Sequence, residues 1–232
     1  FNDDTTYALL HTRMPTSGKR DDSGAQPFMV NNTITTHNGY YFDVESLKTK
    51  WSIAKESGVD SELIARYISS HGVKTLPKFI ESTDGPSAIA AMHENNLYLI
   101  RSGNPLVTCQ FDFDDGNKIF LYASTGQILF SALKYVWLIS ETIKSTSLEE
   151  RILFQATPDG MTKLSKPFEE DHLWAGSLAD IHNYTEGGAY GSSFGAETLD
   201  NYNYNLPPYG PYGRDKRATR YFPDRRKAFA KK

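Results

Sequence analysis

The feature that most restricts the fold is a series of four short apolar runs in the middle of the chain. Clusters of Asn, Gly, Asp, Ser and Pro separate these runs, as expected for strands joined by tight connections. Helical patterns lie before and after the series, so like elements come in groups rather than in strict alternation. This order favours a layered α+β fold over a doubly wound parallel sheet. The runs are Ser87–Met92, Leu97–Arg101, Leu106–Phe111 and Ile119–Ala123.

Three further segments have strand patterns. Thr6–His11 is a short apolar run that ends in polar residues, and it predicts a buried strand. Thr33–Tyr41 predicts a strand with a turn at Asn38-Gly39, because Asn-Gly is a strong tight-turn signal. Ile152–Leu164 predicts a hairpin about Pro158-Asp159-Gly160.

Four segments predict helices. Gly58 and Gly72 stand where a helix C-terminus usually places glycine. Asp60 is expected to cap the second helix at its N-terminus. The predicted helices are Val44–Glu56, Ser61–Ser70, Leu76–Glu81 and Gln127–Ile139.

The composition fits a globular protein with one core. The chain has 232 residues, of which 39% are hydrophobic and 23% are charged. No apolar run approaches the ~18–20 residues that span a bilayer. The single cysteine, Cys109, excludes an internal disulfide framework and a cysteine-based zinc site, and we expect it to be a small buried hydrophobe. A reducing, cytoplasmic location is therefore the expectation.

Charge and composition divide the chain into two predicted parts. Residues 1–166 form the folded domain, and residues 167–232 form a Gly/Tyr/Pro-rich and then basic extension that is disordered or ordered by a partner. Pro207–Lys232 carries nine Lys/Arg and two Asp/Glu, a net charge of +7, against −10 for the other 206 residues. Arg interleaved with aromatic residues suits nucleic acid, but it suits a solvated tail or one that docks on an acidic protein equally well. Nucleic acid is thus possible but not favoured.

Four blocks, in order and at similar spacing, resemble motifs of a known family. They match its H-T-R-W-A-T-H-G, H-N-G, D-T-E-V-I and R-S-G-S-P-L-V patterns. The chain resembles the glutaminase domain of class II glutamine amidotransferases, a branch of the N-terminal nucleophile hydrolases, and most of all the glucosamine-6-phosphate synthase type. The resemblance covers roughly residues 5–165 and implies a four-layer α-β-β-α sandwich. The blocks are His11–Gly18 (HTRMPTSG), His37–Gly39 (HNG), Asp60–Ile64 (DSELI) and Arg101–Val107 (RSGNPLV).

The resemblance also assigns roles to residues. Arg13 and Thr16 would bind the carboxylate of glutamine, and a guanidinium can do so with two parallel hydrogen bonds. Asp60 would bind the ammonium group. The Asn38 side-chain amide and the Gly39 backbone N–H would form the oxyanion hole. No cofactor is implied, and the six histidines show no metal-binding pattern.

The family's nucleophile is an N-terminal cysteine whose α-amine acts as the base. The printed sequence begins with Phe1, so we expect this cysteine and the first strands of the domain to lie upstream of it. Three positions depart from the family pattern: Met14 replaces Trp, Ser17 replaces His, and Gln26-Pro27 stands where His-Pro is usual. These departures affect the fine fit to glutamine rather than the anchoring residues.

The expected function is a glutamine-hydrolysing amidotransferase domain that releases ammonia through a glutamyl thioester. The chain as printed would be inactive. Only about 65 residues follow the matched region, so the acceptor chemistry would belong to a separate acceptor or partner protein. The alternative is a non-catalytic structural or interaction protein that docks through its C-terminal extension. A hydrolase of another amide on the same scaffold is a third possibility.

Among the histidines, His37 is expected to be structural rather than catalytic.

Overall fold

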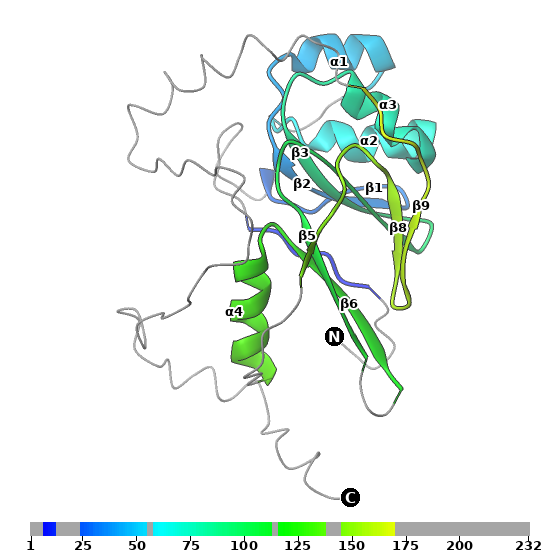
Figure 1. Cartoon of the computed structure of the whole chain (residues 1–232). Helices are drawn as coiled ribbons and strands as arrows, with labels where there is room; N and C mark the ends of the chain where they lie inside the picture. Colours follow the sequence, from blue (N-terminus) through cyan, green and yellow to red (C-terminus); the bar gives the residue numbers. More distant parts are fainter. Residues whose placement is uncertain (1–6, 13–23, 55–57, 113–115, 138–144, 170–232) are drawn as a thin grey trace, which may run out of the picture. The chain divides into compact units, whose positions relative to one another are not determined.

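Two antiparallel sheets form the centre of the computed structural model of this chain (Figure 1). The structure describes residues 7–12, 24–54, 58–112, 116–137 and 145–169, all within the first of two units of the chain. One sheet has the strand order β1-β2-β3-β4-β8-β9, and the other has the order β6-β5-β7. The strands are β1 (Phe28–Val30), β2 (Thr33–Gly39), β3 (Ser87–His93), β4 (Asn96–Ser102), β5 (Val107–Asp112), β6 (Lys118–Ala123), β7 (Thr146–Ser147), β8 (Phe154–Thr157) and β9 (Gly160–Lys163).

Helices cover the outer face of each sheet. The α-helices are α1 (Val44–Trp51), α2 (Glu62–His71), α3 (Leu76–Glu81) and α4 (Gly126–Trp137), and a 3-10 turn, η2 (Val73–Thr75), joins α2 to α3. None of the described helices is long and apolar enough to cross a membrane.

Alternation along β3 sets the two faces of the larger sheet. Ile89 and Ala91 pack into the core beneath α1, α2 and α3, whereas Ala88 and Ala90 pack into a second core shared with the smaller sheet. Successive side chains of a strand point to opposite faces, so the central strands β3 and β4 each contribute to both cores.

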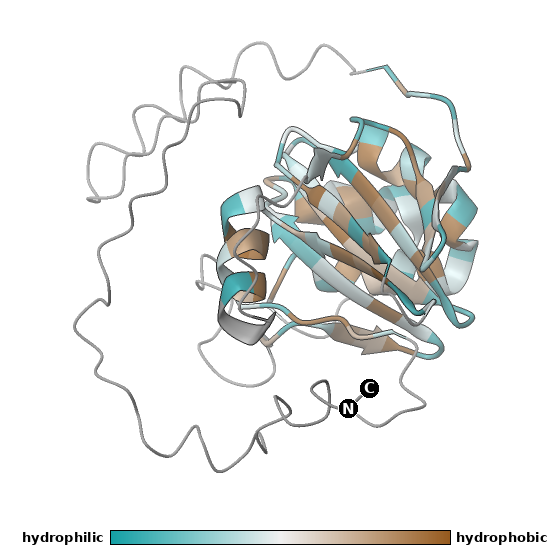
Figure 2. Ribbon diagram, turned by 60° about the horizontal axis from the view of Figure 1, so that its bottom comes forward, coloured by the Kyte–Doolittle hydropathy of each residue, from teal (hydrophilic) through white to brown (hydrophobic). Residues whose placement is uncertain are grey.

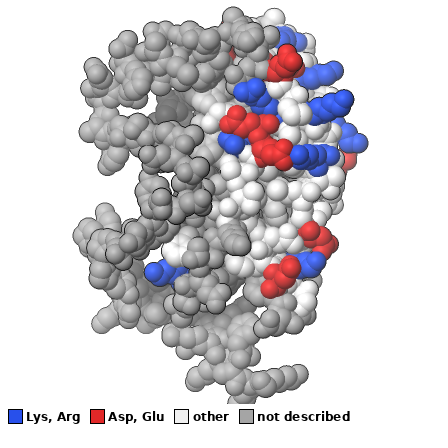
Figure 3. All heavy atoms as spheres, in the orientation of Figure 1, with Lys and Arg blue, Asp and Glu red and all other residues white. Residues whose placement is uncertain are grey.

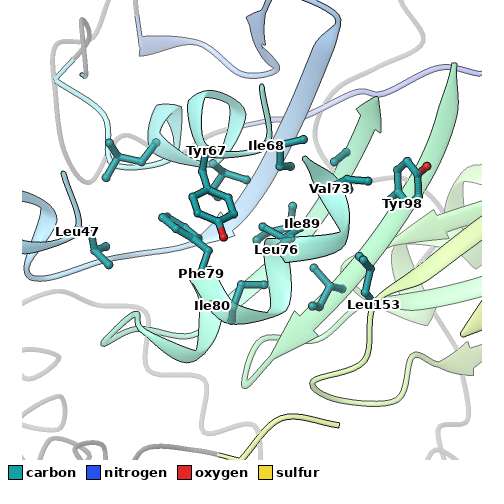
Figure 4. Close-up of a cluster of buried hydrophobic side chains, with 14 of the residues drawn as sticks. Leu47, Tyr67, Ile68, Val73, Leu76, Phe79, Ile80, Ile89, Tyr98 and Leu153 are labelled. Carbon is teal, nitrogen blue, oxygen red and sulfur yellow. The ribbon is translucent and has the colours of Figure 1, made fainter. Parts of the chain in front are cut away.

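The core under the helices is the larger one (Figure 4). Tyr67 and Phe79 meet there with their ring centroids 4.6 Å apart, and the Tyr67 hydroxyl donates to the Thr75 carbonyl oxygen. Ile89 rises from β3 into the same cluster and has no exposed surface. Burial of this apolar face fixes α2 and α3 on the sheet.

Removing one methyl group from this core gives a testable stability change. Ile89→Val is expected to lower the free energy of unfolding by about 0.5–1.5 kcal/mol, because it leaves a small cavity among fully buried neighbours. The matched control is Ile128→Val on α4, where the side chain is 54% exposed and the change should stay within about 0.5 kcal/mol. Urea unfolding of both variants measures the difference, and equal losses would contradict the placement of Ile89.

Helix α4 completes the layers on the outer face of the smaller sheet. Leu129 of α4 packs against Val107 and Cys109 of β5. Figure 2 shows hydrophobic residues along the strands and on α4, with hydrophilic residues on the surrounding loops and outer helix surfaces. The described residues therefore form the four-layer α-β-β-α sandwich predicted by the resemblance.

The surface seen in Figure 3 carries both signs of charge. Lys and Arg lie beside Asp and Glu on the side where α1 and α3 lie in Figure 1. Lys48 and Glu45 of α1 form one such pair, with Nζ 2.7 Å from Oε2. This view shows no extended patch of positive charge on the described residues of the kind that binds nucleic acid. The basic tail on which that possibility depended lies outside the described residues, as does all but residues 167–169 of the predicted extension.

Most predicted strands are confirmed, but two strand interpretations are wrong. Tyr7–Thr12 forms no ladder with any described residue, although its partly buried and exposed residues alternate as in a strand. Asn38-Gly39 makes no turn, because β2 stays paired with β3 up to the pair of Gly39 with Ser87. The hairpin β1–β2 instead turns at Asn31, which has a positive φ of 50°.

The predicted helices differ mainly at their ends. The first ends at Trp51 rather than Glu56, because Ser52 adopts the left-handed conformation and donates its N–H to the carbonyl oxygens of Lys48 and Thr49. Gly58 therefore does not end this helix. The helix Leu76–Glu81 and the end of α2 at Gly72 are confirmed. Helix α4 starts one residue earlier than predicted, and the predicted end at Ile139 lies outside the described residues.

Candidate active site

A cavity of about 1160 Å³ lies between the end of β2, the start of α2, strand β6 and residues 7–12. Two of its walls are each formed by an unbroken stretch of the chain. Tyr7–Thr12 and Ile119–Ser124 each contribute six consecutive residues. A strand that lines a cavity with one face contributes alternate residues, so the cavity meets these two segments along their edges. It has the form of a slot between two extended segments.

Three of the five predicted site residues line this cavity: Asn38, Gly39 and Asp60. They come from the end of β2 and from the residues just before α2. Arg13 and Thr16 lie outside the described residues. The blocks that begin at His11 and Asp60 both contribute to the lining, although 49 positions separate them in the sequence.

Asn38 and Gly39 are held at the edge of the larger sheet. Asn104 Nδ2 donates a hydrogen bond of 2.8 Å to the Asn38 carbonyl oxygen and so joins two of the motif blocks. Backbone N–H groups of a strand point alternately to its two edges. The Gly39 N–H therefore points to the same edge as the His37 N–H, away from β3, and an oxyanion-hole donor needs such a fixed orientation.

Gly39 allows a close approach that no other residue would permit. A Cβ at this position would lie 2.2 Å from His37 Nε2 and 2.2 Å from the Pro86 carbonyl oxygen. Both neighbours are tightly held: His37 is buried, and the Pro86 oxygen belongs to the backbone just before β3. The glycine thus serves close packing rather than a turn.

Asp60 is buried beside the same edge, with 4% of its surface exposed. Its Oδ2 accepts the Tyr41 backbone N–H at 2.9 Å. The prediction that Asp60 caps α2 is wrong, because α2 begins at Glu62 with Ser61 at the N-cap and no side-chain capping bond. The carboxylate is used to hold the chain after β2, and it remains part of the cavity wall.

His37 lies beneath this edge in a network that the sequence did not predict. Its Nδ1 is 2.9 Å from Ser61 Oγ, and its ring stacks on Tyr41 with centroids 4.8 Å apart. The Gln26 carboxamide bonds to both the N–H and the carbonyl oxygen of His37. Burial, with a smaller contribution from His11, lowers the pKa of His37 to about 3. The imidazole is therefore neutral near pH 7 and supplies no charge to the cavity.

The lowered pKa of His37 predicts acid destabilisation. In the unfolded chain a histidine binds a proton below pH 6.5, whereas in the folded chain His37 stays neutral down to about pH 3. The stability contributed by neutral His37 is present above pH 6.5 and is lost as the pH falls from 6.5 towards 3. At pH 5 the loss is roughly 2 kcal/mol, at about 1.4 kcal/mol per pH unit.

Urea unfolding at pH 7 and pH 5 measures this loss. His37→Gln should make the difference between the two pH values smaller. His71→Gln is the control, because His71 is exposed at the end of α2 and should leave the difference unchanged. A His37→Gln protein with the full wild-type pH dependence would show that another group is responsible.

Cys109 and Arg101, also named from the sequence, stabilise the fold and do not line the cavity. Cys109 is buried on β5 against α4 and is not among the cavity residues, as expected for a small hydrophobe. Burial raises the pKa of its thiol, which opposes thiolate formation. Arg101 donates to the Leu148 carbonyl oxygen and pairs with Glu150 at 2.7 Å, so this motif residue ties β4 to the segment before β8.

Known proteins resemble the chain in both sequence and fold. Glutamine–fructose-6-phosphate aminotransferase (isomerizing) from Buchnera aphidicola subsp. Acyrthosiphon pisum is 25% identical over 169 residues, which are 62% of this chain. The glutamine phosphoribosylpyrophosphate amidotransferase from B. subtilis, solved with ADP and GMP, covers 67% of the chain with a TM-score of 0.50 and 18% identity. The chain is thus similar in sequence to a glutamine-using aminotransferase and in fold to a glutamine amidotransferase.

The similarity covers only part of the length of these enzymes. The chain spans 28% of the Buchnera enzyme and 34% of the B. subtilis enzyme. A glutamine aminotransferase class-II domain protein from Silicibacter pomeroyi also aligns, over 65% of this chain and 73% of its own, with 16% identity and a TM-score of 0.43. No known family profile matches the chain. In the described residues, no three His, Cys, Asp or Glu side chains are grouped to hold a metal ion.

Proposed function

We propose that this chain is the glutamine-hydrolysing domain of an amidotransferase, which releases ammonia through a glutamyl thioester. The observation that carries the proposal is the meeting of Asn38, Gly39 and Asp60 at one cavity. A carboxylate for the ammonium group of glutamine and donors for an oxyanion thereby face the same space. Both similar enzymes are named for glutamine, which supports the same substrate.

In this proposal Arg13 binds the α-carboxylate of glutamine with Thr16, and Asp60 binds the α-ammonium group. The thiolate of an N-terminal cysteine attacks the side-chain amide carbon, and its α-amine carries the thiol proton to the leaving ammonia. Asn38 Nδ2 and the Gly39 N–H stabilise the oxyanion in both the acylation and the hydrolysis step. Water then cleaves the thioester to glutamate, and the ammonia passes to an acceptor.

The proposal assigns the nucleophile to a segment outside the printed sequence, because Cys109 is buried away from the cavity. The slot between β6 and residues 7–12 suits such a segment. Among the described residues, β6 is the edge strand of its sheet, and its backbone can pair with another strand.

The decisive test is the intact mass of the mature protein from its native source, before and after treatment with a glutamine-like diazo ketone. Such a reagent alkylates an activated N-terminal thiol. We expect the mass to show additional residues upstream of Phe1 that begin with cysteine, and to increase by one adduct after treatment. A mass that begins at Phe1 and shows no adduct would contradict it.

That second result would favour the alternative, a non-catalytic protein that reuses the fold and docks through residues 167–232. The printed chain itself gives this alternative one supporting observation. Its only cysteine has a buried thiol with a raised pKa, so the printed residues supply no activated thiol. Binding of glutamine without turnover, measured by calorimetry, would then separate a relic pocket from an active one.

A further inference from the structure

We infer that Gln26 is a positioning residue, which holds the oxyanion-hole edge of β2 in register with the start of α2. This inference rests on the proposed glutaminase function and names a residue at which the chain departs from the usual His-Pro pattern of the family. Gln26 precedes β1, contributes to the cavity lining and touches two different elements.

The first contact replaces a missing length of strand. Strand β1 pairs with β2 only over Thr33–Thr35, so no described strand pairs with the outer edge of β2 at His37. There the Gln26 Oε1 accepts the His37 N–H at 2.6 Å, and its Nε2 donates to the His37 carbonyl oxygen at 3.1 Å. One carboxamide thus makes both hydrogen bonds that a residue of a neighbouring strand would make. The Gly39 N–H lies two residues further along the same edge.

The second contact joins this edge to α2. Gln26 Nε2 also donates to Ser61 Oγ at 3.3 Å, and Ser61 Oγ lies 2.9 Å from His37 Nδ1. The Ser61 hydroxyl group thus lies between the Gln26 carboxamide and the neutral His37 ring and is within hydrogen-bond distance of both. Gln26, His37 and Ser61 therefore close a ring of hydrogen bonds between β2 and the residue after Asp60.

The network depends on a carboxamide. The orientation of the group is fixed, because the His37 N–H needs an acceptor and the His37 carbonyl needs a donor. A carboxylate of the same shape keeps the first bond, loses both donated bonds and sets an oxygen against the His37 carbonyl oxygen. Gln26→Glu is thus an isosteric change that breaks the ring. Asp60 keeps its own bond to the Tyr41 N–H in this variant.

Gln26→Glu should therefore affect stabilisation of the oxyanion, which is measured by kcat, but not binding of glutamine by Asp60, which is measured by KM. In the mature, full-length protein, Gln26→Glu is expected to lower kcat for glutamine hydrolysis about 10- to 100-fold, because misplaced donors act mainly on the transition state. The KM for glutamine should change less than about threefold, since Asp60 stays in place. The matched control is Gln155→Glu on β8 of the same sheet, where another half-buried carboxamide donates to Asn96 Oδ1 at 2.8 Å. It should leave both constants unchanged.

Amide hydrogen exchange tests the positioning without any need for turnover. In the wild-type protein the His37 amide should be protected, although no described strand pairs with it there, and Gln26→Ala, which removes the acceptor of the His37 N–H, should speed its exchange at least about tenfold. Equal exchange in Gln26→Ala and Gln155→Ala, or an unprotected His37 amide in the wild type, would overturn the inference. Faster exchange with unchanged kcat would overturn its catalytic part. A wild-type protein without glutamine turnover would contradict the proposed function instead, and the exchange rates would still decide whether Gln26 holds the edge.

Discussion

Asp60→Asn is expected to raise the KM for glutamine about 100-fold in the mature protein, with a much smaller effect on kcat. The carboxylate is buried at the cavity wall, where its attraction for the ammonium group of glutamine is little screened by water. A hydrogen bond to a charged group contributes roughly 1.5–3 kcal/mol, and about 2.7 kcal/mol corresponds to a factor of about 100. The contact exists in the ground state and in the transition state alike, so KM carries the loss.

Asparagine is the informative replacement because it keeps an oxygen for the Tyr41 N–H that Asp60 accepts at 2.9 Å. Asp43→Asn is the matched control. Asp43 also accepts a backbone N–H through one carboxylate oxygen, from Ser46 at 3.0 Å, but it does not line the cavity. Steady-state kinetics of both variants should show a raised KM for Asp60→Asn alone. An unchanged KM in that variant would remove Asp60 from the glutamine site.

The layered fold was predictable because local signals and tertiary packing agree in the centre of the chain. β3 and β4 are apolar runs that end at turn residues, and both become central strands with two buried faces. Leu76–Glu81 is a helix as predicted because Pro77 sits at its first turn and its apolar residues face one core. The ends of elements were less predictable, as at Ser52, where a residue other than glycine or asparagine takes the left-handed conformation.

The residues of the site could be predicted from the sequence, but the hydrogen bonds that hold them in place could not. The resemblance pointed to Asn38, Gly39 and Asp60, and the fold brings all three to one cavity. Local sequence rules misread all three, because pairing with β3 overrides the turn signal at Asn38-Gly39, and Asp60 binds the Tyr41 N–H instead of capping α2. In the sequence, Gln26 stands out only as a departure from the usual His-Pro pattern, which assigns it no role. Its contacts reach 11 and 35 positions along the chain, so no local pattern encodes them.

Gly39→Ala is expected to lower kcat for glutamine hydrolysis by about 10²–10³, the usual cost of losing one oxyanion-hole donor. The added methyl group would stand 2.2 Å from both His37 Nε2 and the Pro86 carbonyl oxygen. Neither neighbour can move freely, because Ser61 and Tyr41 hold the His37 ring and Pro86 is bound into the backbone. The end of β2 must shift instead, and with it the Gly39 N–H. Overpacking of this kind also lowers the free energy of unfolding by about 1–3 kcal/mol.

Gly116→Ala separates these effects from a general cost of replacing glycine. Gly116 lies before β6 with a φ of +83°, and a Cβ added there would meet no atom within 4 Å, so alanine adds backbone strain without a clash. That strain costs about 1 kcal/mol of stability and should leave kcat unchanged. Steady-state kinetics and urea unfolding of the two variants measure both quantities. If Gly39→Ala lost stability as expected but kept its kcat, the close approach at Gly39 would serve packing alone, and the oxyanion donor would have to be sought elsewhere on the cavity wall.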